Sequence, residues 1–302
     1  ILTYDKKWRA GLKKFEVLKH QRNVVSQEIN QAKKKKDEKT AKQKIKSMQD
    51  VVAQIKKQET VVQKSLEKRD SLIEQVGNIL HSSVPVGKDD SENVEIRKFG
   101  KVPEFKFPIK DHIELGESLD LFEFDVAAKN SGSRFYYLKN EAVLLSMALQ
   151  RFAVDRLLTK GYALHATPIM LNKGALKGGV NLSEFEDTIY KIEDEDLYLI
   201  ATSEHPLIAL KRDEMLQEKD LPLKICGISP CFRKELGAHG RDDKGIFRVH
   251  QFNKVEQIVY CKPKNSQKFF DELQKNSEEL FKELKIPFRV VQICTGDLGN
   301  KQ

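Results

Sequence analysis

The chain has few of the features that stabilise small secreted proteins or anchor proteins in membranes. Its 302 residues include only four cysteines, which form no CxxC pair, and no His or Cys lies near them at zinc-finger spacing. We therefore expect reduced, mostly buried thiols and no disulfide framework. No run of 18 apolar residues is present, and residues 1–10 lack the apolar stretch of a secretory signal. A cytoplasmic location without a membrane partner is expected.

Glycine-rich phosphate-binding motifs are also missing. Neither GxxxxGK[ST] nor GxGxxG occurs, so the P-loop and Rossmann modes of nucleotide binding are excluded. The glycines of residues 174–179 are too irregular for a phosphate loop, and we interpret them as a mobile connection. Any nucleotide must then be held by side chains on strands. No protein-bound metal site is predicted.

Charge is unevenly distributed along the chain. The formal net charge is +8, but residues 1–82 hold 20 Lys and Arg against 10 Asp and Glu, whereas the remainder holds 33 against 35. The first segment therefore carries the whole positive excess. This asymmetry indicates a polyanion-binding arm attached to a nearly neutral body.

Hydrophobic residues in this basic segment follow a heptad pattern. In the second half the stripe is predicted at Ala41, Ile45, Met48, Val52, Ile55, Glu59, Val62, Leu66, Arg69, Ile73, Val76 and Leu80. In the first half it is predicted at Trp8, Leu12, Phe15, Leu18, Arg22, Val25, Ile29 and Ala32. Two antiparallel helices that fold back at Lys33–Lys39 are expected. Periodicity alone is equally compatible with a dimerisation or spacer device.

The charge favours nucleic acid as the partner of this arm. Lysines that meet phosphates release counterions, which gives salt-dependent affinity without reading sequence. The candidate contacts are the lysines at the tip, Lys33, Lys34, Lys35, Lys36 and Lys39. Residues 83–93 are rich in turn formers and predict a linker between an arm at 1–82 and a body at 94–302.

The body shows alternating helix and strand signals. An amphipathic helix is predicted from about Lys139 to Lys160, closed by Gly161 and followed by a strand within 161–170. A second helix, capped by Asn265 or Ser266, is predicted to end at Lys285 and to precede a strand at 288–294.

The most informative stretch, residues 225–260, predicts two strands joined by a long polar loop at 236–245. Alternation places one set of side chains on a common face, namely Cys231, Arg233 and Glu235 on the first strand and Arg248, Phe252, Lys254 and Glu256 on the second. Ion pairs across a solvated hairpin would explain such charges. Two guanidinium groups beside carboxylates also suit a ligand that has both phosphate and amine groups.

A further stretch, residues 197–206, has a strand-like alternation. Tyr198, Ile200, Thr202 and Glu204 are predicted to share one face, which places a hydroxyl beside a carboxylate. Taken alone, Thr202-Ser203-Glu204 is more typical of a strand end or a helix cap.

These motifs carry a family resemblance. Phe232-Arg233-Lys234-Glu235, Gly240-Arg241-Asp242 and the run from Phe247 to Glu256 resemble the second signature motif of class II seryl-tRNA synthetases. Residues 161–170, with Pro168, resemble the first motif, which builds the homodimer interface of that family. The arm at residues 1–82 resembles the N-terminal domain of the family, which binds the long variable arm and the elbow of serine tRNA.

The resemblance implies an α+β fold with an antiparallel sheet flanked by helices, preceded by a helical coiled-coil hairpin. It implies activation of serine by ATP, with Mg²⁺, to seryl-adenylate and transfer of serine to the 3′ end of tRNA(Ser). The implied ATP contacts are Arg233, Lys234, Glu235 and the Val249 backbone, with Arg233 and Glu235 as catalytic residues. The implied serine contacts are Thr202, Ser203, Glu204 and Glu256, and Arg248 is either a ligand or a loop anchor.

Three finer points follow from the resemblance. The family's third motif would come shortly after residue 302, so the catalytic core at 94–302 is expected to be incomplete at its C-terminal end. The residues that follow His239 and Gly245, His239-Gly-Arg-Asp and Gly245-Ile-Phe-Arg, resemble those of eukaryotic cytosolic enzymes of the family. The alternatives are a catalytically altered paralogue and a coiled-coil nucleic-acid-binding protein that uses its body as a scaffold. The paired charges at Arg233, Glu235 and Glu256 argue against a scaffold.

Overall fold

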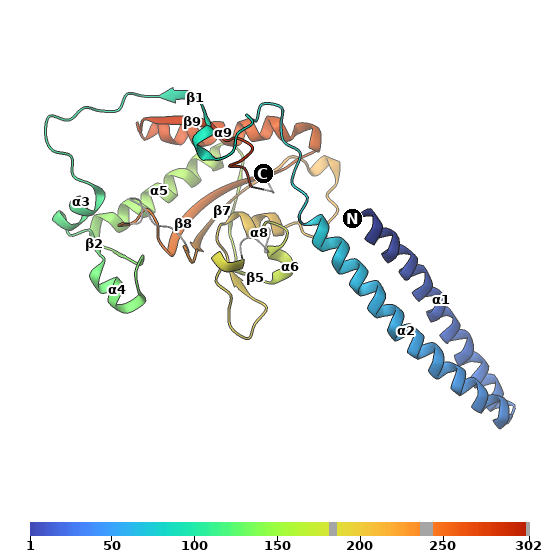
Figure 1. The fold of residues 1–302 in the computed structure, drawn as a ribbon. Helices are drawn as coiled ribbons and strands as arrows, with labels where there is room; N and C mark the ends of the chain where they lie inside the picture. The colour runs from blue at the N-terminus through green and yellow to red at the C-terminus, as the bar shows by residue number, and fades with distance from the viewer. Residues whose placement is uncertain (181–185, 236–243, 300–302) are drawn as a thin grey trace. The chain divides into compact units, whose positions relative to one another are not determined.

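A computed structural model describes residues 1–180, 186–235 and 244–299 of the protein. The chain forms two compact units, Ile1–Leu80 and His81–Leu298. The first unit consists of helices α1 (Leu2–Lys34) and α2 (Glu38–Ile73) (Figure 1). Asp37 caps α2, because its carboxylate accepts hydrogen bonds from the backbone N and the hydroxyl of Thr40 at 3.1 and 2.7 Å.

Contacts between the two helices of this hairpin are polar as well as apolar. Arg69 lies 4.3 Å from the ring centroid of Trp8 and forms an ion pair with Asp5. Gln58 Nε2 donates to the carbonyl of Gly11 at 3.0 Å, where a side chain at position 11 would meet Gln58 and Val62. The predicted antiparallel pairing is therefore present.

The heptad register of α2 was half wrong. Six predicted positions lie on the partly or fully buried stripe, namely Ala41, Met48, Ile55, Val62, Leu66 and Arg69. At the other predicted positions within α2 the stripe is shifted by one residue, so Val51 is buried whereas Val52 is 48 % exposed, and Ile45 and Ile73 are also exposed. The inner positions alternate by three and then four residues, and Lys44 and Gln58 occupy two of them because each has a polar partner on α1, Glu28 and the Gly11 carbonyl. On α1, Gly11 rather than Leu12 lies inside, and Arg22 is exposed.

Helix α2 also ends earlier than predicted. It stops at Ile73, and Val76 and Leu80 lie beyond it and are exposed. Gly77 lies just after this point and disfavours continuation of the helix.

The second unit contains short helices and strands around one long antiparallel pair. The helices are α3 (His112–Ser118), α4 (Asp125–Ser131), α5 (Asn140–Thr159), α6 (Lys173–Leu176), α8 (Glu204–Ala209) and α9 (Ser266–Glu283). The strands are β1 (Val94–Phe99), β2 (Phe122–Glu123), β3 (Tyr137–Leu138), β4 (Ala163–Ala166), β5 (Met170–Leu171), β6 (Tyr198–Leu199), β7 (Leu223–Phe232), β8 (Gln251–Tyr260) and β9 (Phe288–Gln292).

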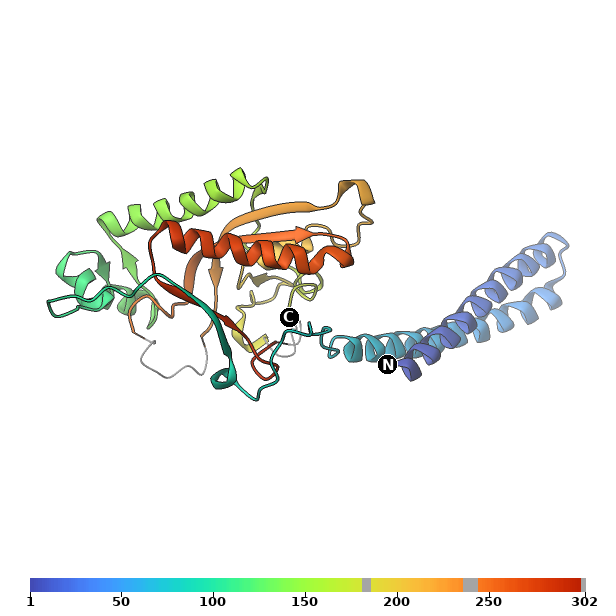
Figure 2. The ribbon, with the colours of Figure 1, turned by 90° about the horizontal axis from the view of Figure 1, so that it is seen from above.

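The central sheet has the order β4-β7-β8, with β7 and β8 antiparallel and β4 parallel to β7. Helices α5 and α9 lie side by side over one face, and α8 lies on the other (Figures 1 and 2). Cys226, Val255 and Val259 point toward α5 and α9, where they pack with Leu157 and Tyr162. The opposite face of β7 contacts α8, since a side chain at Gly227 would meet Leu207.

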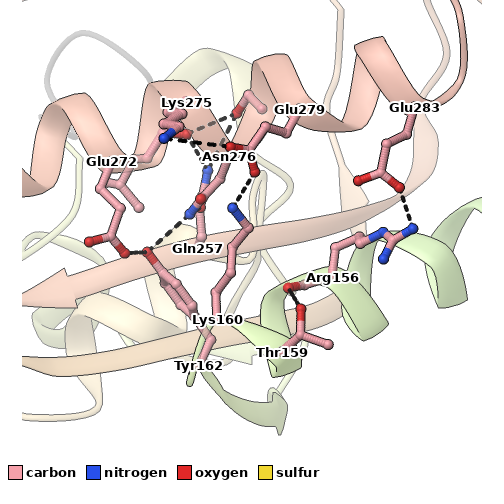
Figure 3. A network of polar contacts seen from close by, with 12 residues as sticks. Arg156, Thr159, Lys160, Tyr162, Gln257, Glu272, Lys275, Asn276, Glu279 and Glu283 are labelled. Carbon is pink, nitrogen blue, oxygen red and sulfur yellow. Dashed lines mark hydrogen bonds and ion pairs between the residues drawn. The ribbon is translucent and has the colours of Figure 1, made fainter.

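Polar groups also lie under α9 (Figure 3). Asn276, only 4 % exposed, donates to Gln257 Oε1 at 2.9 Å and to the Tyr162 hydroxyl at 3.3 Å. Tyr162 in turn donates to Glu272, and Gln257 Nε2 donates to the carbonyl of Leu273 at 2.9 Å. Each buried polar group of this set has a partner, which is the condition under which burying it is tolerated.

The end of α5 and the state of the cysteines agree with the predictions, whereas the start of α9 and residues 173–176 differ in detail. Gly161 closes α5 with φ +81°, as predicted, and all four cysteines are free thiols. Asn265 precedes α9 but makes no side-chain capping bond. Residues 173–176, predicted to be a mobile connection, form the short helix α6. Among the helices that the structure describes, none has the length and apolarity needed to span a bilayer.

Candidate active site

The register of β7 and β8 determines which side chains meet on the α8 face. Ser229 is opposite Lys254 and Cys231 is opposite Phe252. The backbone N of Arg233 donates to the carbonyl of His250 at 2.9 Å, which continues the ladder one step past the strand end. Phe252, Lys254 and Arg233 therefore share one face, as the alternation predicts, together with Glu256.

Thr202 joins this face from the loop between β6 and α8. Its hydroxyl donates to Glu256 Oε2 at 3.4 Å and accepts from Lys254 Nζ at 2.8 Å and from the backbone N of Glu204 at 3.1 Å. Lys254 also forms an ion pair with Glu256. A hydroxyl, a carboxylate and an ammonium thus converge, although Thr202 and Glu256 are 54 residues apart.

The predicted strand over residues 197–206 was wrong beyond Leu199. Strand β6 contains only Tyr198 and Leu199, and α8 begins at Glu204. Thr202 and Glu204 nevertheless belong to the same cluster. Burial raises the pKa of Glu204 above its ordinary value, the charge of Glu256 adds to this, and Lys254 opposes it. Two carboxylates near one lysine suit a cationic ligand.

Ser203 faces inward. Its side chain is fully buried, and its hydroxyl shares a 2.8 Å hydrogen bond with the hydroxyl of Ser229 on β7. This bond ties the loop before α8 to the sheet. The geometry gives Ser203 a positioning contact and leaves its side chain no path to a ligand.

Arg233 is exposed at the open end of the same face. Its guanidinium carbon lies 5.1 Å from the ring centroid of Phe252, and its Nε donates to the carbonyl of Ala201 at 3.2 Å. These two contacts orient the planar group, and no other residue in the described part of the chain accepts from its remaining N–H donors, which suit an anion.

Glu235 and Arg248 lie outside the strands in which they were predicted, because β7 ends at Phe232 and β8 begins at Gln251. They form an ion pair at 3.1 Å, and Glu235 adopts φ +48°. The carbonyl of Glu235 accepts from Arg134.

The other two predicted ATP contacts lie beside this pair in sequence. Lys234 is held through its backbone N, which donates to the carbonyl of Thr188 at 2.9 Å. Val249 is buried.

Sequence reasoning missed several residues that support this region. His250 Nδ1 lies 2.8 Å from the carbonyl of Arg233 and 3.0 Å from the Tyr190 hydroxyl, and its ring packs against Phe135. His112 accepts from the backbone N of Ile246 at 3.2 Å. These contacts join segments that are distant in sequence, so no local pattern announces them. Most of the predicted polar loop, residues 236–243, lies outside the described residues.

His205, directly after the cluster, is 5 % exposed. Burial lowers its pKa to about 4, and the charges of Lys254 and Arg233 act in the same direction. Its Nδ1 has no hydrogen-bond partner among the residues that the structure describes. The imidazole is therefore neutral at physiological pH.

Known proteins share both parts of the chain. Family models match residues 1–80 as the seryl-tRNA synthetase N-terminal domain and residues 188–302 as the class II tRNA synthetase core domain (G, H, P, S and T). A serine–tRNA ligase from Methanospirillum hungatei is 46 % identical over 99 % of this chain and 70 % of its own length. The chain belongs to the seryl-tRNA synthetase family.

Solved structures agree with this assignment. Seryl-tRNA synthetase from Pyrococcus horikoshii, complexed with ATP, matches with a TM-score of 0.80 and 44 % identity, over 99 % of this chain and 71 % of the other. Cytoplasmic serine–tRNA ligase from Naegleria fowleri, in complex with AMP, matches with a TM-score of 0.76 and 36 % identity, over 99 % and 68 %. The predicted class II fold, the serine–tRNA ligase function and the enzyme class are confirmed.

Proposed function

We propose that the α8 face of β7 and β8 is where this chain activates serine with ATP, giving seryl-adenylate and pyrophosphate before the seryl group passes to the 3′ end of tRNA(Ser). The observation that carries the proposal is the convergence of Thr202, Glu256, Glu204 and Lys254 beside Arg233. One end of this face suits an ammonium and a hydroxyl, and the other suits a phosphate.

On the ATP side, Arg233 is proposed to hold the α-phosphate. The serine carboxylate attacks the α-phosphorus in line, so catalysis consists of positioning and charge stabilisation. Lys234, Glu235 and the Val249 backbone complete the proposed ATP contacts. The Arg248–Glu235 ion pair supports Arg248 as a loop anchor, because its guanidinium is already engaged with that carboxylate.

Mg²⁺ is proposed to arrive with ATP. Among the described residues no group of three or more His, Cys, Asp or Glu could hold a metal ion. Mg²⁺ commonly keeps several waters and binds through one or two carboxylates plus substrate phosphates, which fits a face with few carboxylates. When bound, the ion would neutralise charge on the phosphate oxygens.

On the serine side, Glu256 and Thr202 are the proposed partners of the ammonium and hydroxyl. Glu204 supplies the second carboxylate, and Ser203 is proposed to fix the loop through Ser229 rather than to touch serine with its side chain. A pocket that relied on size would separate serine from alanine by only ~1–3 kcal/mol, so polar partners for the hydroxyl are needed.

The arm, residues 1–82, is proposed to bind tRNA(Ser) through its basic surface, including Lys33, Lys34, Lys35, Lys36 and Lys39. Deleting it should abolish tRNA charging at physiological salt and leave serine-dependent pyrophosphate exchange largely intact. The comparison requires exchange and filter-binding measurements over a range of salt concentrations. Unchanged tRNA affinity and salt slope after the deletion would show that the arm is not the tRNA-binding element.

A homodimer is proposed through α5 and β4. Leu144, Leu145 and Met147 of α5 are each more than 60 % exposed, and Leu164 of β4 is also exposed. Apolar side chains gathered on one element favour burial in an interface. Pro168, in the motif next to β4, belongs to the same proposed interface.

The cytoplasm is the proposed location. The finer assignment to the eukaryotic cytosolic type lacks support, because the relatives at 45–46 % identity are archaeal, including one from Methanocella arvoryzae. The altered-paralogue alternative would require the serine contacts to be intact without tRNA charging.

The experiment that tests the proposed function is ATP–pyrophosphate exchange with a panel of amino acids. Serine should support exchange, and alanine, glycine and threonine should support it poorly. Exchange that depended on another amino acid, or no binding of serine at all, would overturn the proposal.

A further inference from the structure

Lys254 was not among the predicted serine contacts, yet it lies at the centre of the cluster. Its ammonium donates to Thr202 Oγ1 at 2.8 Å and forms an ion pair with Glu256. The side chain is 32 % exposed and Glu256 is 19 % exposed, so the pair is half-buried and open to solvent on one side.

The hydrogen-bonding capacity of Thr202 is fully used in this arrangement. A hydroxyl has one donor and two acceptor lone pairs. The donor goes to Glu256, and the two acceptor positions go to Lys254 Nζ and the backbone N of Glu204. The bond from Glu204 N is part of the turn into α8. An incoming ammonium can therefore reach Thr202 only by replacing Lys254.

The charges of the cluster point the same way. A lysine ammonium and the ammonium of an amino acid have the same charge and the same three donors. Glu204 and Glu256 repel each other, and Lys254 counteracts that repulsion. The cluster needs one cation at this position, and either ammonium can supply it. Lysine has a flexible four-carbon stem, so its charge can move without a backbone change.

We propose that in the free protein the Lys254 ammonium occupies the position that the substrate ammonium takes, and that serine displaces it from Thr202 and Glu256 toward the serine carboxylate. This inference rests on the proposed function. Lys254 then becomes a specificity residue. A ligand with both an ammonium and a carboxylate gives the displaced lysine a new partner, whereas an amine without a carboxylate displaces it and offers none.

The test compares two ligands that differ at the carboxylate. Serine and ethanolamine share the ammonium and the hydroxyl, and only serine has the carboxylate. Dissociation constants are measured by calorimetry or by NMR titration for the wild-type protein and for Lys254→Met, which removes the charge and keeps an unbranched side chain only one atom shorter. The variant should bind ethanolamine more tightly, since the competitor is gone, and the ratio of the serine to the ethanolamine dissociation constant should rise about tenfold or more.

Control variants separate this effect from general damage. Lys224→Met removes a similarly half-buried lysine, which is paired with Glu272 on the opposite face of the sheet, and should leave the ratio unchanged. Lys254→Arg retains the charge and should stay within about threefold of the wild-type ratio. Circular dichroism spectra confirm that each variant is folded before titration.

Two results would overturn the inference. An unchanged ratio in Lys254→Met, or weaker ethanolamine binding, would mean that Lys254 does not occupy the ammonium position. If the wild-type protein supports serine-dependent exchange in that case, the proposed function stands and only the role of Lys254 falls. If the wild-type protein binds no serine, both fall together.

Discussion

The two faces of the β7–β8 pair both hold polar groups, but they hold them differently. Under α9, Asn276, Gln257 and Tyr162 form mainly neutral hydrogen bonds, each with a defined partner (Figure 3). On the α8 face, Thr202 and Glu256 belong to a cluster of ions that is open to solvent. The same strands thus separate a network that contributes to stability from a network that is arranged for a ligand.

The difference lies in what each network leaves free. Within the described residues, the buried polar groups of the α9 network all have partners, so a ligand would add no hydrogen bond there. The α8 face keeps Glu204 with a raised pKa, and some N–H donors of Arg233 have no acceptor among the residues that the structure describes. Perturbed ionisable groups beside unused donors are typical of binding and catalytic sites.

The largest effect should come from Arg233→Lys. Lysine keeps the charge but lacks the planar fork, so contacts with the α-phosphate are lost and serine-dependent exchange should fall about tenfold or more. Arg97→Lys is the matched control, because Arg97 pairs with Glu278 of α9, the helix that covers the other face of the sheet. Normal exchange in Arg233→Lys would return Arg233 to a structural role.

Glu256→Gln should act on serine rather than on ATP. The neutral amide cannot form an ion pair with an ammonium, so the Michaelis constant for serine should rise about tenfold and the preference over alanine should narrow. Exchange at saturating ATP measures both. Glu272→Gln alters a carboxylate of the α9 network and should lower stability with serine kinetics intact. An effect of Glu256→Gln on ATP alone would place β8 on the nucleotide side.

His205 predicts how the α8 face responds to acid. Its pKa is about 4 when folded and near 6.5 when unfolded, so the unfolded state takes up the proton first. Above pH 6.5 His205 does not lower the free energy of unfolding. As the pH falls from 6.5 to about 4, its protonation in the unfolded state lowers that free energy progressively. His205→Met removes this contribution, which is at most ~3 kcal/mol at the acid end. Urea denaturation of both proteins across this pH range should give converging curves at neutral pH. Parallel curves would contradict the assignment.

The smallest functional effect is expected for Asn276→Leu. The change leaves Gln257 Oε1 without its amide donor and should reduce the free energy of unfolding by ~1–3 kcal/mol. The Michaelis constant for serine should stay within a factor of about two. A large change in that constant, with stability unaffected, would show that the two networks are not separate.

Local periodicity explains what could be predicted from the sequence. The period of two in β8 places Phe252, Lys254 and Glu256 on one face, and the side chains of Arg233 and Phe252 do meet. The contact of Thr202 with Glu256 could be inferred only from the family resemblance, since nothing in either segment specifies their pairing. The register of α2 was misread because polar residues with partners, Lys44 and Gln58, occupy inner positions. Period alone cannot distinguish such residues from exposed ones.

The most direct test of the division between faces is hydrogen–deuterium exchange with and without a non-hydrolysable seryl-adenylate analogue, 5′-O-(N-seryl)sulfamoyladenosine. Ligand binding protects the segments that it orders. We expect slower exchange in residues 200–209, around Thr202 and α8, and unchanged exchange in α9, residues 266–283. Protection of α9 with residues 200–209 unchanged would contradict the assignment of the α8 face as the ligand site.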